Sequence, residues 1–141
     1  MNSTRRLFYF VLAPVLVLAT IAWAGERMDV EQKIPWQTDL AAAVNEADKT
    51  ELPVMVYFTA DWCGPCQQMK KTTWVDDDVV ALAESFVPVM IDTDAEPELT
   101  QKHSIQYLPT LLVLDGEGAE QARVFGYQSA KQVTDLLSKH V

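Results

Sequence analysis

Two spacings of apolar residues alternate along the chain, namely short continuous runs and stretches in which apolar residues recur every three or four positions. The first is typical of buried strands and the second of helices with one buried face. Buried strands are predicted at 54–58, 86–92 and 110–114, and a strand with one exposed face at 120–125. Helices are predicted at 38–49, 66–74, 77–84 and 96–103, with a last helix starting at Ser129.

Capping and turn residues support several of these boundaries. Thr38 is expected to cap the first helix, and Ser129 followed by Gln132 has the spacing of a capping box. Asp115-Gly116-Glu117-Gly118 predicts a turn between the last two strands. Pro88 lacks a backbone N–H, so pairing of its strand is expected to begin late.

This order of elements predicts an α/β fold. Helices separate the early strands and a tight hairpin joins the last two, which implies a central mixed sheet of about four to five strands with helices on both faces. Three aromatic residues within the apolar patterns are expected in the core: Phe58, Trp74 and Phe125.

The first 24 residues have the pattern of an export signal. Arg5 and Arg6 precede an apolar run from Leu7 to Ile21, and Ala22-Trp23-Ala24 fits a small-x-small cleavage site. Residues 7–24 carry no charge and are also long enough for an uncleaved membrane anchor. Both alternatives place the remaining chain outside the cytoplasm, in the periplasm, either soluble or anchored to the inner membrane.

Composition and charge limit what the exported part can be. Residues 25–33 are polar and are interpreted as a tether, which leaves residues 34–141 as one globular domain. The 141-residue chain has a net charge of −9. Loss of residues 1–24 would leave 9 basic and 20 acidic side chains, or −11, which argues against a nucleic-acid partner.

The only two cysteines, Cys63 and Cys66, lie where a predicted strand passes into a predicted helix. The free amides and dipole of a helix N-terminus stabilise a thiolate, so Cys63 is the predicted nucleophile. Cys66, one turn further and more buried, is the predicted resolving thiol. Pro65 fits the first helical turn, and Trp62 is expected to lie beside the sulfurs as an apolar wall.

Two other interpretations of the cysteine pair are weaker. A zinc site normally has four ligands, but there is no second cysteine pair, and His103 and His140 lack the required spacing. A purely structural disulfide would close a loop of a few residues and remove little chain entropy. No metal and no cofactor are therefore expected.

Residues 35–141 resemble the thioredoxin superfamily. The resemblance is carried by Trp62-Cys63-Gly64-Pro65-Cys66 after a buried strand, by Leu108-Pro109-Thr110, and by Gly126 after the last strand. It implies the thioredoxin fold, with a cis peptide bond at Pro109 packed against the cysteines. It also implies a groove in which a substrate segment lies extended against the backbone of Leu108. The expected groove residues are Trp62, Gly64, Pro65, Leu108, Pro109 and Gly126.

One departure from the family concerns the proton acceptor for Cys66. Cytoplasmic thioredoxins carry a buried Asp six residues before the first cysteine, where this chain has Tyr57, and their partner Lys is replaced around Pro88. Asp61, Tyr57 and a water-mediated route are the alternatives for a proton relay. Lys70 and Lys71, which replace a helix-kinking Pro, could hold a thiolate or simply form a solvated face.

The resemblance implies a thiol:disulfide oxidoreductase, similar to the exported C-terminal domain of DsbD-type reductases. The Gly-Pro dipeptide is similar to that of reducing members, so reduction of protein disulfides through a mixed disulfide on Cys63 is expected. The expected partners are protein thiols or disulfides and a membrane-embedded electron donor. The alternatives are a redox-inactive binding or holdase module and an oxidase or isomerase that uses the same site.

Overall fold

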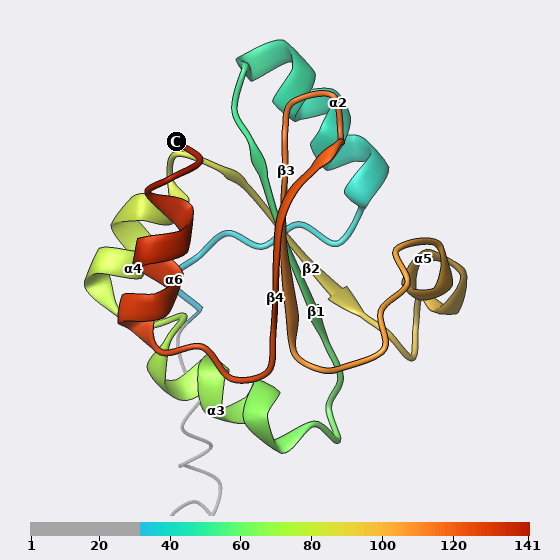
Figure 1. Cartoon of the computed structure of the whole chain (residues 1–141), viewed down its shortest axis with the longest axis vertical. Coiled ribbons are helices and arrows are strands. Elements are labelled where there is room, and N and C mark those ends of the chain that lie inside the picture. The colour runs from blue at the N-terminus through green and yellow to red at the C-terminus, as the bar shows by residue number, and fades with distance from the viewer. Residues whose placement is uncertain (1–31) are drawn as a thin grey trace, which may run out of the picture.

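The structure of the chain is a computed structural model that describes residues 32–141 (Figure 1). The predicted export signal or anchor, residues 1–24, and all but the last two residues of the predicted tether, 25–33, lie outside the described residues. Within residues 32–141, no helix is long and apolar enough to span a membrane.

Four strands form one mixed sheet in the order β2-β1-β3-β4. The strands are β1 (Val54–Thr59), β2 (Val87–Asp92), β3 (Thr110–Leu114) and β4 (Glu120–Phe125). Strand β1 pairs with β2 in parallel and with β3 antiparallel, and β3 pairs with β4 antiparallel. The predicted mixed sheet is confirmed, with β1 at its centre.

Helices cover both faces of this sheet, as predicted. They are α2 (Leu40–Thr50), α3 (Gly64–Thr72), α4 (Asp77–Ala83), α5 (Pro97–Lys102) and α6 (Ala130–Leu137). Helices α3, α4 and α6 lie on one side of the sheet, and α2 and α5 on the other (Figure 1).

Alternate residues of β1 belong to two separate cores. Met55 and Tyr57 pack with Trp74 and with residues of α4 and α6, whereas Val56 and Phe58 pack with residues of α2. All six residues of β1 are buried, because successive side chains of a strand point to opposite faces and both faces are covered. The core positions predicted for Phe58 and Trp74 are confirmed.

The helix caps confirm one predicted boundary and correct two others. Ser129 caps α6 in a complete capping box with Gln132. Asp39, not Thr38, caps α2, and its Oδ1 accepts a hydrogen bond from the N–H of Ala42 at 2.9 Å. Helix α3 begins at Gly64 instead of residue 66, with Cys63 as its N-cap.

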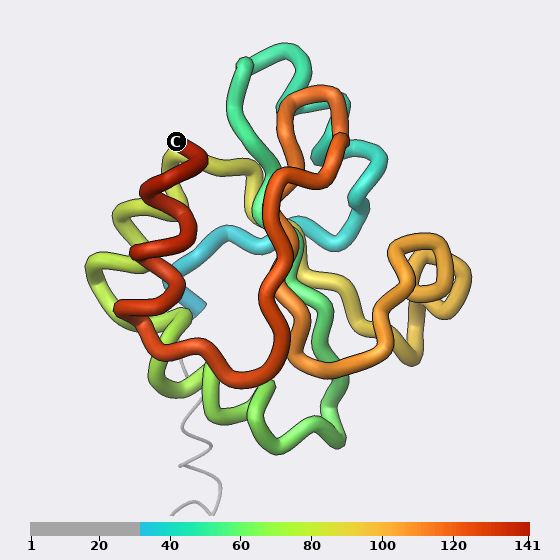
Figure 2. The backbone as a smooth tube through the Cα atoms, viewed as in Figure 1, coloured from blue at the N-terminus to red at the C-terminus, as the bar shows by residue number. Residues whose placement is uncertain are grey.

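Pairing of β2 begins at its first residue, so the prediction of a late start at Pro88 is wrong. Val87 is paired with Val54, and its N–H donates to the carbonyl of Pro53. Pro88 is tolerated because β2 is an edge strand and Pro88 directs its missing N–H away from β1. Gln37 lies along that outer edge, where its N–H donates to the Pro88 carbonyl. Figure 2 shows the blue segment before α2 crossing the sheet at this edge.

The predicted core position of Phe125 is wrong, since 51% of this side chain is exposed. Phe125 ends the edge strand β4, and its ring packs edge-on against Tyr107 with the centroids 6.0 Å apart. An apolar residue at the end of an edge strand satisfies the sequence pattern without being covered by a helix.

The correction at α2 gives a direct stability test. Substitution Asp39→Ala removes the oxygen that accepts the Ala42 N–H, and we expect it to lower the free energy of unfolding by about 1 kcal/mol. Thr38→Ala is the matched control, with an expected change below about 0.3 kcal/mol. Urea denaturation followed by circular dichroism measures both, and equal effects would contradict this assignment of the cap.

Candidate redox site

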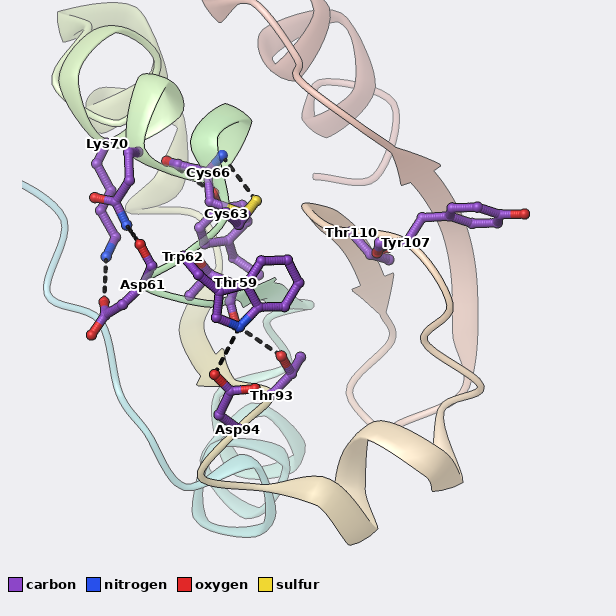
Figure 3. Close-up of a disulfide and its surroundings, with 12 residues drawn as sticks. Thr59, Asp61, Trp62, Cys63, Cys66, Lys70, Thr93, Asp94, Tyr107 and Thr110 are labelled. Carbon is purple, nitrogen blue, oxygen red and sulfur yellow. Dashed lines mark hydrogen bonds and ion pairs between the residues drawn. A yellow bond between two sulfur atoms is a disulfide. The ribbon is translucent and has the colours of Figure 1, made fainter.

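The cysteine pair lies where the central strand passes into α3. Ala60, Asp61 and Trp62 connect β1 to Cys63, and Cys63 and Cys66 form a disulfide with their Cα atoms 5.3 Å apart (Figure 3). The buried strand fixes the position of the loop, and the first turn of the helix fixes the second cysteine relative to the first. The two sulfurs are therefore held within bonding distance by local structure.

The N-terminus of α3 provides hydrogen bonding to the sulfur of Cys63. The backbone N–H of Cys66 donates to Cys63 Sγ at 3.2 Å. Pro65 occupies the first turn, where its missing N–H leaves no intrahelical bond unmade. In the reduced protein the same N–H and the helix dipole favour the thiolate at Cys63.

Both cysteines are largely covered. Cys63 is 4% exposed and Cys66 is fully buried, because Ala60 and Leu108 pack against them. The predicted nucleophile, Cys63, is therefore almost as buried as the predicted resolving thiol, Cys66. It is nevertheless the only one of the two that offers any surface to a partner.

The loop before β3 lies against the disulfide. The Leu108–Pro109 peptide bond is cis, as the resemblance implies. Leu108 contacts the cysteines, and the N–H of Gly126 donates to the Pro109 carbonyl at 2.8 Å. Gly126 adopts a φ of +74°, a conformation that glycine tolerates best. The structure therefore brings Cys63, Leu108, Pro109 and Gly126 together from distant parts of the chain.

Trp62 is fixed by a contact that the sequence analysis missed. Its indole N–H donates to Asp94 Oδ2 at 2.9 Å, although 70% of the residue is exposed (Figure 3). Asp94 follows β2, and Trp62 follows β1. The carboxyl ends of parallel strands meet at one edge of a sheet, so the helical connection between these two strands, which favours parallel pairing, was the signal that could have identified Asp94.

Further exposed aromatic residues surround the cis-proline loop. Tyr107 is 65% exposed and pairs with Phe125, so each of the two rings adjoins a predicted groove residue in sequence. Tyr127 follows Gly126, and its hydroxyl is 3.2 Å from Thr72 Oγ1. Large exposed rings next to a reactive pair are suited to contact with a partner chain.

Tyr57 occupies a fully buried position beneath the cysteines. Its hydroxyl donates to the carbonyl oxygen of Cys66 at 3.4 Å, and its ring packs with Trp36 and Trp74 at centroid distances of 6.0 and 4.9 Å. Burial raises the pKa of Tyr57 above its ordinary value. The phenol is therefore neutral and protonated at neutral pH and cannot act there as a carboxylate would.

Asp61 points to solvent and is not buried beneath the cysteines. Its carboxylate is 93% exposed and lies 3.8 Å from the Nζ of Lys70, which is itself only 23% exposed. Lys71, the next residue, is exposed. The two lysines that the sequence left equivalent thus differ in environment. No described group of three or more His, Cys, Asp or Glu residues could hold a metal ion.

Comparisons with known proteins agree with this geometry. The thioredoxin-like domain family matches residues 40–140. A thioredoxin-like protein of Synechocystis sp. is 39% identical over 89 residues, which cover 63% of this chain and 82% of that protein. A thioredoxin of Alicyclobacillus acidocaldarius is 32% identical over 97 residues, covering 69% and 90% of the respective chains.

Solved structures share the same arrangement of helices and strands. The solution structure of a thioredoxin from Thermus thermophilus superposes with a TM-score of 0.66 at 26% identity, covering 76% of this chain and 86% of that one. The fold is therefore the thioredoxin fold. With its cysteine pair at the β1–α3 junction, this chain belongs to the thioredoxin-like family and is a thiol–disulfide oxidoreductase.

Proposed function

We propose that this protein is an exported oxidoreductase that reduces disulfides in other proteins. The proposal depends on one observation above all, namely that Cys63 caps α3 and contacts the Leu108–Pro109 loop while Cys66 is buried behind it. This arrangement gives the two thiols different roles. Cys63 reacts with the partner protein, and Cys66 reacts only with Cys63.

The reaction proceeds in two exchanges. The Cys63 thiolate attacks one sulfur of the substrate disulfide, forming a mixed disulfide and releasing the other substrate sulfur as a thiol. The Cys66 thiolate then attacks Cys63 Sγ, which forms the Cys63–Cys66 disulfide and releases the second substrate thiol. Two electrons and two protons pass from the cysteine pair to the substrate, and a donor must then reduce the pair.

The surroundings of Cys63 support an extended polypeptide as substrate. Within the described residues, the backbone N–H and C=O of Leu108 make no hydrogen bond and are free to pair with a partner strand. Trp62 and Tyr107 supply exposed aromatic surface near the cysteines (Figure 3), and Phe125 packs against Tyr107. Gly64 and Pro65 are the remaining predicted groove residues, and Gly64 has open space where a side chain would be.

Three features support export and the reducing direction. The Gly-Pro dipeptide between the cysteines and the likeness to DsbD-type domains favour a reductant. The apolar segment 7–24 with its Ala22-Trp23-Ala24 end favours export by a cleaved signal or an anchor. A membrane-embedded donor fits both, because the periplasm lacks a soluble pool of reductant.

The roles of the two cysteines are tested by trapping. Cys66→Ala removes the resolving thiol, and we expect it to accumulate covalent adducts through Cys63 that dithiothreitol releases. Cys63→Ser is the matched control and should form no adduct and reduce no disulfide. A redox-inactive binding module would keep its partners in Cys63→Ser, and retention of those partners without reducible adducts in Cys66→Ala would overturn the proposal.

The direction of the reaction is tested by the reduction potential. Equilibration with glutathione should give a value below about −220 mV, near those of reducing family members and far from about −120 mV for a strong oxidant. The protein should also accelerate insulin reduction by dithiothreitol. A potential near that of the strong oxidants, with no insulin reduction, would favour the oxidase or isomerase alternative.

Export is tested by fractionation of a Gram-negative host that expresses the full chain. We expect the protein in the periplasmic or inner-membrane fraction, with a mature N-terminus at Gly25 if the signal is cleaved. Replacing Leu16 and Leu18 with Arg should retain it in the cytoplasm, because two charges interrupt the apolar run. Cytoplasmic recovery of the unaltered chain would contradict this part of the proposal.

A further inference from the structure

A pocket of about 290 Å³ is lined by Asp61, which precedes Trp62 in the chain, and by residues from other regions. These regions include the end of β1, strand β2 with the segment before α5, and the last turn of α3. Charged, hydroxyl and indole groups in the lining come from residues that include Trp36, Thr59, Asp61, Lys70, Asp92 and Glu96. Neither the two-step exchange nor the packing of the core uses this pocket.

Negative charge predominates in the pocket. Three carboxylates, Asp61, Asp92 and Glu96, line it together with one ammonium, that of Lys70. Lys70 lies 3.8 Å from Asp61, whereas no cation pairs with Asp92 or Glu96 among residues 32–141. An excess of two negative charges therefore faces any ligand that enters.

Two lining residues of the pocket carry buried hydrogen-bonding groups. Thr59 is 4% exposed; its hydroxyl faces the Tyr57 hydroxyl, and its Oγ1 accepts no hydrogen bond within the described residues. The indole N–H of Trp36 is likewise buried and unpartnered. Leaving such groups unbonded costs free energy, so a ligand that donates to Thr59 Oγ1 is favoured, and the Trp36 N–H can donate to a carbonyl of the bound segment.

A metal ion does not suit this pocket, because no described group of carboxylates, histidines or cysteines is arranged to hold one. The permanently charged cationic side chains that a polypeptide substrate offers are the ammonium of lysine and the guanidinium of arginine. Each supplies the positive charge and the N–H donors that the carboxylates and Thr59 can accept.

One lining residue of the pocket, Asp61, lies two positions before Cys63 in the chain. Asp61 immediately precedes Trp62, and the Trp62 indole is bonded to Asp94, two residues after Asp92. Figure 3 shows Asp61 and Lys70 to the left of Cys63, Asp94 below it and Tyr107 to the right. Two residues of an extended chain span about 6.6 Å, so binding here requires the substrate segment to direct a side chain near its cysteine past Trp62 toward Asp61.

We propose that this pocket binds a lysine or arginine side chain of the polypeptide whose disulfide Cys63 attacks. The proposal rests on the proposed reductase function and names its substrate class, namely disulfides whose cysteine has a basic residue within about two positions. The acidic surface of the protein then contributes to substrate choice as well as to solubility.

Single-turnover kinetics with synthetic peptides test the proposal. Each peptide carries one cysteine capped by mercaptoethanol, with Arg, citrulline, Ser or Glu two positions before or after it. The pre-reduced protein should react about fivefold faster with Arg than with its neutral isostere citrulline in at least one position, and slowest with Glu. The preference should fall as salt is added.

Variants locate the effect in the pocket. The double substitution Asp92→Asn with Glu96→Gln removes both unpaired charges while keeping side-chain acceptors, and it should abolish the Arg preference. Glu98→Gln is the matched control, because Glu98 lies in the first turn of the helix that begins directly after Glu96 and does not line this pocket. It should retain the preference.

The outcomes separate this inference from the proposed function. If the protein reduces the Ser peptide but shows no Arg preference over citrulline, only the pocket proposal is overturned. The same holds if Glu98→Gln loses the preference as fully as the double variant, since long-range charge would then suffice. Failure to reduce any capped peptide would overturn the reductase proposal itself. The citrulline comparison uses the unaltered protein and holds even if the double variant does not fold.

Discussion

The central position of β1 determines the rest of this structure. The strand is hydrogen-bonded on both edges, to β2 and to β3, and is covered on both faces, so it has no freedom to shift. Its carboxyl end places Cys63 at the N-terminus of α3, where the Cys66 N–H reaches the sulfur at 3.2 Å. Its neighbours place Trp62 beside Asp94 and the cis-proline loop beside the disulfide. A rigid centre therefore supports reactive groups that lie mostly in loops, which suits a site that must accept different partner chains.

Beneath the cysteines, an aromatic cluster occupies the place where the resemblance to cytoplasmic thioredoxins implied a buried acid. Tyr57, Trp36 and Trp74 pack together, and the Tyr57 hydroxyl bonds to the Cys66 carbonyl. A neutral phenol hydrogen-bonds with the backbone around Cys66 but adds no negative charge near either sulfur. Formation of a thiolate is thereby not opposed by a neighbouring carboxylate, and protons exchanged with Cys66 need another acceptor.

The two sides of the disulfide differ in chemistry. Toward Tyr107 and Phe125 the surface is aromatic and exposed, and toward Asp61 and Asp94 it is acidic, with a pocket over Thr59. A partner chain that crosses Cys63 would meet apolar surface on one side and negative charge on the other, which is a basis for orientation as well as for affinity.

The sequence by itself determined the order of elements, the mixed sheet and the cysteine pair, because continuous apolar runs, helical spacing and the Trp62–Cys66 motif are local signals. It failed at Phe125, since apolarity does not tell whether a neighbouring element covers a side chain, and at Pro88, since edge position is a property of the whole sheet. Only the tertiary structure distinguished Lys70 from Lys71, joined Trp62 to Asp94 and assembled the pocket above Thr59. These features arise between segments distant in sequence, and the physical reason is that strand pairing and packing, not local propensity, decide which side chains meet.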